Sequence, residues 1–185
     1  MNESREVLRL RAFFEGLNVL VVDDDVACRD VFTSLLAELG AAVLVAADGI
    51  EALALLREHD PDLVLSDVMM PRLDGYALVR QVRDDPARTG LPMIAVSASF
   101  PAADQQSARP EVDGTLMKPF DYRDLDRALQ QVMLKRPALF KRQRRRLRAR
   151  ATAQRARAGD IRGKARFLRE AIERRQSIDR SHEAA

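Results

Sequence analysis

Five short apolar runs alternate with segments of helical hydrophobic spacing along this 185-residue chain. Of all its sequence features, this alternation restricts the possible folds most. The runs predict strands at 18–22, 42–46, 62–66, 92–96 and 114–117. Apolar residues at helical spacing predict helices over 26–39, 49–58, 74–84 and 121–134. Between the last two strands, residues 101–112 are polar and interrupted by Pro110, so we expect a short or mobile helix there.

The apolar strands carry almost no polar residues, which indicates that both faces of the sheet are buried. Strands that alternate with helices in this way favour a parallel sheet with helices on each side. Right-handed crossover connections then leave few topologies. The sequence therefore predicts an α/β fold with a doubly wound, five-stranded parallel sheet of the flavodoxin-like type.

Polar residues gather where the predicted strands end. Asp23, Asp24 and Asp25 follow the first strand, Asp67 follows the third, and Ser97 and Lys118 follow the fourth and fifth. Ligands of open parallel sheets bind at the carboxyl ends of the strands, so one pocket would hold several carboxylates, a hydroxyl and an ammonium group. Taken singly, each acid could instead cap a helix or form a turn.

Crowded carboxylates repel one another unless one of them is protonated or a cation lies between them. Oxygen ligands completed by water favour Mg²⁺ over zinc. A Mg²⁺ ion beside a carboxylate and a lysine suits a phosphoryl group, which the carboxylate attacks in line. On this reasoning Asp67 is the candidate nucleophile, the other acids hold the metal, and Ser97 and Lys118 bind phosphoryl oxygens.

Four motifs in residues 18–134 resemble the receiver domain of two-component response regulators. They are VLVVDDD at 19–25, LVLSDVMMPRLDG at 63–75, SA at 97–98 and KPF at 118–120. The resemblance implies that Asp67 is the phosphoacceptor and that Asp23, Asp24, Asp67 and the Met69 carbonyl bind Mg²⁺. It also implies a phosphate-binding and switching role for Ser97 and Lys118, and a cis peptide bond between Lys118 and Pro119. Thr115 stands where the family often has an aromatic residue that rotates on activation.

The function implied is that of a phosphoryl-accepting switch, a phosphoprotein of a two-component system or phosphorelay, which signals through a non-standard output. Its partner would be a sensor histidine kinase or a histidine phosphotransfer protein. We expect no enzymatic activity beyond self-phosphorylation and slow self-dephosphorylation. An aspartyl-nucleophile phosphatase of similar fold is disfavoured because Met69 stands where such enzymes typically have a second acid.

The remaining segments are an N-terminal amphipathic helix within 1–17 and an Arg-rich helical extension over 135–185. Residues 1–134 carry 13 basic and 23 acidic side chains, a net charge of −10, whereas the extension carries 18 and 5, a net charge of +13. Ile161, Ala165, Leu168 and Ile172 form one helical stripe. We expect these C-terminal helices to bind a protein or to form a dimer. A solvated tail, an anionic membrane surface and a nucleic-acid-binding regulator whose extension is controlled by the receiver domain are the alternatives.

No apolar stretch is long enough to span a bilayer. The chain has a single cysteine, Cys28, so it cannot form an internal disulfide, and this fits a reducing compartment. The expected location is the cytoplasm.

Overall fold

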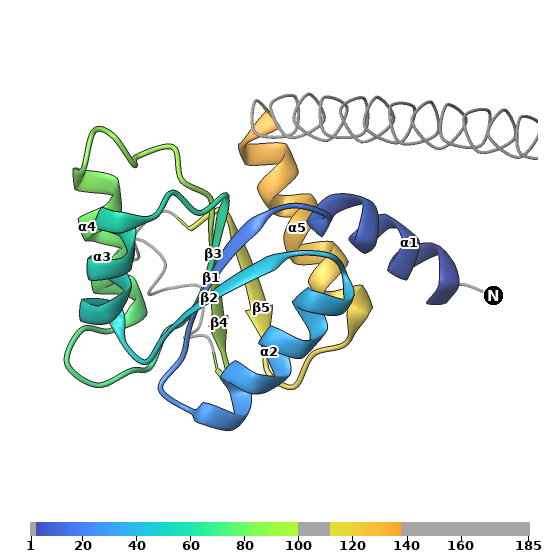
Figure 1. Cartoon of the computed structure of the whole chain (residues 1–185), viewed down its shortest axis with the longest axis horizontal. Helices are drawn as coiled ribbons and strands as arrows, with labels where there is room; N and C mark the ends of the chain where they lie inside the picture. The colour runs from blue at the N-terminus through green and yellow to red at the C-terminus, as the bar shows by residue number, and fades with distance from the viewer. Residues whose placement is uncertain (1–2, 100–111, 138–185) are drawn as a thin grey trace, which may run out of the picture. The chain divides into compact units, whose positions relative to one another are not determined.

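A computed structural model describes residues 3–99 and 112–137 of the chain (Figure 1). The described strands are β1 (Asn18–Val22), β2 (Ala42–Ala46), β3 (Leu63–Asp67), β4 (Met93–Ser97) and β5 (Gly114–Met117). The described helices are α1 (Glu3–Phe14), α2 (Val26–Glu38), α3 (Gly49–Glu58), α4 (Gly75–Asp84) and α5 (Tyr122–Lys135). The bounds of α1 fall inside the predicted segment 1–17, and every other element begins and ends within one residue of its predicted range. The predictions for the segment 101–112, apart from Val112, and for the extension beyond 137 lie outside the described residues.

The five strands form one parallel sheet in the order β2-β1-β3-β4-β5. The order reverses at β1, so the sheet is doubly wound and flavodoxin-like, as the sequence predicted. The register pairs Val22 with Ser66 and Asp67 with Val96, which brings the carboxyl ends of β1, β3 and β4 to the same edge. Figure 1 shows α3 and α4 on one side of the sheet and α2 and α5 on the other.

Each face of the sheet has its own apolar core. Val19 and Val21 of β1 point into the layer beneath α1, α2 and α5, whereas Leu20 and Val22 point into the layer beneath α3 and α4. All four valine and leucine side chains of this strand are at most 1% exposed. Burial on alternate sides explains why the strand sequence is continuously apolar.

Helix α1 belongs to the core on the α2 and α5 side. Its Leu10 and Phe14 are 1% and 0% exposed, and both lie in the same apolar cluster as the sheet. Two ion pairs fasten its outer side to α5, Arg9 with Asp126 at 3.5 Å and Arg123 with Glu6 at 3.4 Å. The sequence had predicted the helix but gave it no packing partner.

An aspartate N-cap precedes each of α2, α3, α4 and α5. Asp25, Asp48, Asp74 and Asp121 each accept hydrogen bonds from backbone N–H groups of the first turn. Such caps satisfy donors that have no partner within the helix. Asp25 is thus the helix cap among the three acids that follow β1.

A buried acid joins the start of β5 to the end of α5. Asp113 is 1% exposed and accepts hydrogen bonds from Met93 N at 2.9 Å, Arg83 at 2.8 Å and Arg136 at 2.6 Å. Arg136 is the C-cap of α5, so this pair fixes the residue at which the helix ends.

Among the described residues, no helix is long and apolar enough to cross a membrane.

Candidate functional site

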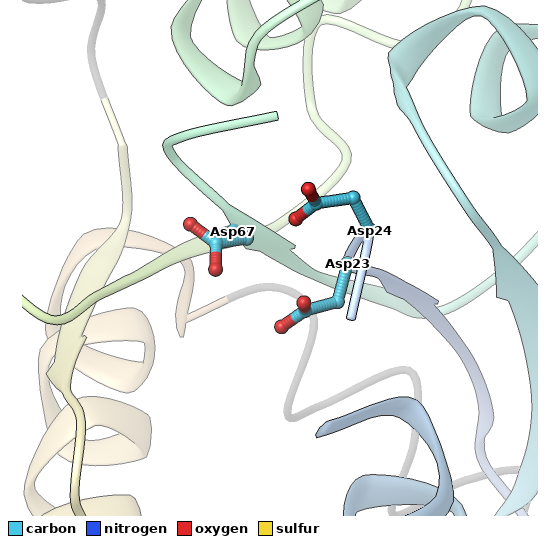
Figure 2. A group of neighbouring side chains, drawn as sticks. All are labelled: Asp23, Asp24 and Asp67. Carbon is cyan, nitrogen blue, oxygen red and sulfur yellow. The ribbon is translucent and has the colours of Figure 1, made fainter. Parts of the chain in front are cut away.

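Three carboxylates meet at the carboxyl edge of the sheet, beyond the ends of β1 and β3 (Figure 2). Asp23 and Asp24 directly follow β1, and Asp67 is the last residue of β3. One oxygen from each lies within 4.8 Å of the others. Asp23 is 1% exposed and Asp67 is 9% exposed, whereas Asp24 is open to solvent. Three of the acids that the sequence singled out therefore lie together, because the carboxyl ends of parallel strands meet at one edge of the sheet.

Lys118 connects two of these carboxylates. It follows β5 directly, and its Nζ lies 2.6 Å from an oxygen of Asp23 and 2.5 Å from an oxygen of Asp67. The peptide bond to Pro119 is cis, as the resemblance implied. The Lys118 backbone N–H donates to the Ser97 carbonyl at 2.8 Å, which ties the loop after β5 to the end of β4.

The electrostatics of the site reflect burial and this lysine. Burial raises the pKa of Asp23, and the hydrogen bond from Lys118 opposes that shift without cancelling it. Burial lowers the pKa of the Lys118 ammonium, but hydrogen bonds and charge from Asp23 and Asp67 outweigh it, so the pKa rises above its ordinary value. Lys118 is therefore protonated at neutral pH.

The backbone around Asp67 is held closely. Its Oδ1 accepts from the Met69 N–H at 2.8 Å, and its carbonyl accepts from the Ser66 hydroxyl at 2.9 Å. A Cβ added to Gly75 would lie 2.1 Å from the Asp67 carbonyl oxygen, so only glycine fits there without a shift of the backbone. These contacts fix the direction in which the Asp67 carboxylate points.

Ser97 is the last residue of β4 and is 2% exposed. Its hydroxyl donates to the Ser99 carbonyl at 2.7 Å and accepts from the Ser99 N–H at 3.2 Å. The structure therefore places Ser97 at the expected edge but with its hydroxyl turned to the following loop.

One supporting residue gave no sequence signal. Arg29, in the first turn of α2, donates to the Asp23 carbonyl at 2.6 Å. This bond holds the backbone of the acidic turn between β1 and α2. Nothing in the local sequence distinguishes Arg29 from the chain's other basic residues, because its partner is a backbone atom.

A cavity of about 730 Å³ opens beside the lysine. Its walls are mainly apolar side chains of α2, including Val31, Phe32 and Leu35, together with Pro119 and Phe120. Val31 is 59% exposed, so part of this apolar wall faces solvent. The site thus combines a polar centre with an apolar wall.

The donor set fits a hard divalent cation. The three side chains offer only carboxylate oxygens, and the ligands that Mg²⁺ prefers are oxygens, with water in the remaining positions. Because Asp24 is exposed, water can reach this side of the carboxylate cluster.

The family model of the response regulator receiver domain matches residues 19–130, more than half of the chain. The chain therefore belongs to the response regulator receiver family, whose members are phosphoacceptor domains of two-component signalling.

The chain is 42% identical over 122 residues to an uncharacterized 14.6 kDa protein of Leptolyngbya boryana, covering 65% of this chain and 93% of that protein. It spans only 44% and 47% of two relatives described as probable transcriptional regulators, from Guillardia theta and Cyanophora paradoxa.

Solved structures agree with the family. The chemotaxis protein CheY4 of Vibrio cholerae aligns with a TM-score of 0.58 at 33% identity, covering 63% of this chain and 98% of that one. The receiver domain of a sensor histidine kinase from Pseudomonas aeruginosa, which has a magnesium ion coordinated in its active-site cleft, aligns with a TM-score of 0.57 at 31% identity. That alignment covers 64% of this chain and 98% of the kinase receiver.

Proposed function

We propose that the protein is a response regulator in which Asp67 accepts a phosphoryl group from a phosphohistidine of a sensor kinase or phosphotransfer protein. The observation that carries the proposal is the position of Asp67, which lies beside two further carboxylates and the Lys118 ammonium. An aspartate that only ended a strand or capped a helix would not require these charged neighbours.

In the proposed reaction an oxygen of Asp67 attacks phosphorus, a P–O bond forms, and the P–N bond to the imidazole breaks. Asp23, Asp24, Asp67 and the Met69 carbonyl would hold Mg²⁺, which when bound neutralises phosphoryl oxygens. Lys118 would exchange its contact with Asp67 for a phosphoryl oxygen and keep its contact with Asp23. The Ser97 hydroxyl, now bonded to Ser99, would turn to bind another phosphoryl oxygen.

The apolar cavity supports a protein as phosphodonor. A kinase or phosphotransfer protein must bring a histidine to Asp67, and the walls from Val31, Phe32 and Phe120 provide apolar surface next to that point. We propose a cytoplasmic location for this encounter, in keeping with the single cysteine of the chain.

For the output we propose that the extension 135–185 binds a protein or a second copy of the chain through its apolar stripe. The alternative is a nucleic-acid-binding extension controlled by the receiver domain. The two differ in their salt dependence, because phosphate contacts weaken steeply as salt rises whereas an apolar contact does not. Salt-dependent retention of the full chain on a nucleic-acid column would support the alternative.

The phosphoacceptor assignment is tested with a small phosphodonor, such as acetyl phosphate, in the presence of Mg²⁺. Intact mass should show one added phosphoryl group on the wild type and none on Asp67→Asn, which keeps the shape but removes the nucleophile. Asp84→Asn, an exposed acid at the end of α4, is the matched control and should be modified like the wild type. An adduct at unchanged yield on Asp67→Asn would overturn the assignment.

A further inference from the structure

The loop between β3 and α4 carries the proposed Met69 ligand. Its first half is tied to the sheet, because Val68 N–H donates to the Val96 carbonyl at 2.9 Å and Met69 N–H donates to Asp67 Oδ1 at 2.8 Å. Its second half, which includes Arg72 and Leu73, has to return the chain to the start of α4. The position of the Met69 carbonyl therefore depends on how that second half is held.

Arg72 has a strained backbone. Its φ is 66°, and it is the one residue other than glycine with positive φ in the described parts of the chain. The Leu73 N–H donates to the Pro71 carbonyl at 2.8 Å, so Arg72 is the central residue of a three-residue turn. A γ-turn with positive φ at its centre is rare and strained, and glycine would adopt this φ at lower cost. Something must offset the strain of an arginine here.

The compensating contact lies on α3. The Arg72 guanidinium forms an ion pair with Oδ2 of Asp48, whose side chain is 1% exposed. The other oxygen of Asp48 caps α3 by accepting from Ile50 N–H at 2.8 Å and Glu51 N–H at 2.9 Å. A buried carboxylate is costly unless it is paired, so Arg72 offsets the cost of burying Asp48.

A backbone contact reinforces the same junction. The Gly49 N–H donates to the Leu73 carbonyl at 3.2 Å, and a Cβ added to Gly49 would lie 2.7 Å from that carbonyl oxygen. The loop after β3 and the first turn of α3 thus touch at two consecutive positions on each side. A strained residue and a buried charge, each costly alone, are joined in one contact.

We propose that the Arg72–Asp48 ion pair is a positioning device that holds the β3–α4 loop, and with it the Met69 carbonyl, in the place where it binds the metal. The inference rests on the proposed function, since it concerns the same metal-binding loop. Arg72 and Asp48 are positioning residues, because their contacts reach the metal site only through the loop.

The test uses the full chain with two changes that remove the pair in different ways. Arg72→Gly removes the guanidinium and relieves the strain, and Asp48→Asn removes the charge but keeps a good N-cap. Arg127→Gln is the matched control, because Arg127 is an exposed arginine paired with an acid far from the loop. The first readout is amide hydrogen exchange of Gly49 and Met69 in metal-free protein. The second is the Mg²⁺ dissociation constant, measured by titration followed by NMR.

Both variants should exchange the Gly49 and Met69 amides faster than the wild type and the control. Both should bind Mg²⁺ roughly tenfold more weakly, the lower end of what residues that orient metal ligands contribute. Phosphorylation should need more Mg²⁺ for half-maximal rate but reach the wild-type rate at saturation, and Arg72→Lys should restore part of the affinity. If the pair only stabilised the fold, removing it would lower the free energy of unfolding and leave the Mg²⁺ affinity of the folded protein unchanged.

Wild-type Mg²⁺ affinity in both variants would overturn the inference, as would unchanged exchange at Gly49 and Met69. These results are distinct from failure of the proposed function. A wild-type protein that binds no Mg²⁺ would end the proposed function and the metal-positioning role together. The metal-free exchange would in that case still show whether the pair holds the loop.

Discussion

Replacing Phe14 by alanine tests whether α1 is part of the receiver core in this chain. The helix precedes the residues matched by the family model, which begin at 19. Nevertheless Phe14 is 0% exposed and lies in one apolar cluster with Leu125 and Leu129 of α5. Its ring also meets that of Phe13 edge to face, with centroids 5.1 Å apart.

The magnitude follows from the area removed from water. A fully buried phenylalanine hides about 150–200 Å² of surface, and at about 25 cal/mol per Å² this amounts to about 4–5 kcal/mol. Alanine retains part of that area, but the cavity left in a packed core adds a further cost. We therefore expect Phe14→Ala to lower the free energy of unfolding by about 3–5 kcal/mol, a large share of the ~5–15 kcal/mol typical of a domain.

Urea unfolding followed by far-ultraviolet circular dichroism measures this difference. Leu8→Ala is the control, because Leu8 lies on the same helix and is 64% exposed. Leu8→Ala should change the free energy by no more than about 0.5 kcal/mol. A Phe14→Ala variant that loses less than about 1 kcal/mol would show that α1 does not contribute to the core, and the packing argument would fail.

Four further changes probe the site and the fold around it. Gly75→Ala should cost about 1–3 kcal/mol and prevent phosphorylation, because its Cβ would lie 2.1 Å from the Asp67 carbonyl oxygen. A Cβ added to Gly90 meets no atom within 4 Å, so Gly90→Ala should leave the free energy of unfolding unchanged or raise it by up to about 1 kcal/mol, as measured by urea unfolding. Lys118→Ala should keep Mg²⁺ binding but weaken the change that phosphorylation causes in the amide NMR spectrum; a wild-type change would exclude a role for this lysine. Asp113→Asn should lower the free energy of unfolding by about 2–3 kcal/mol, measured by thermal unfolding. This is less than for a fully buried ion pair, because Arg83 and Arg136 are partly exposed to solvent. An unchanged free energy of unfolding would contradict the role given to these ion pairs.

The sequence predicted the sheet and the acidic centre because both follow from local patterns. Continuous apolar runs mark strands that are buried on both faces, and apolar residues at helical spacing mark the helices. Once the strands are parallel, their carboxyl ends meet at one edge, so Asp23, Asp67 and Lys118 come together without knowledge of any contact. The rule requires only the order of the strands.

The supports of the site could not be predicted because they depend on a choice among many partners. Arg72 lies in a polar loop and reads as a solvated charge, yet it pairs with Asp48 on another helix. The chain has 31 basic and 28 acidic residues, so no spacing rule selects this pair. For Ser97 the sequence predicted the correct edge of the sheet. It could not predict the hydrogen bond from the Ser97 hydroxyl to Ser99, because that bond depends on the side-chain rotamer.

The charges of the site explain why the lysine and a divalent cation have separate tasks in the proposed reaction. Three carboxylates and the Lys118 ammonium leave a formal charge of −2, which a divalent cation would neutralise. Removing the ammonium makes the cluster more negative, so Mg²⁺ binding should survive in Lys118→Ala. A phosphoryl group on Asp67 adds charge on the side of the site where Nζ already lies 2.5 Å from that carboxylate. In the proposed reaction the lysine is therefore placed to respond to phosphorylation, whereas the acids would hold the cation.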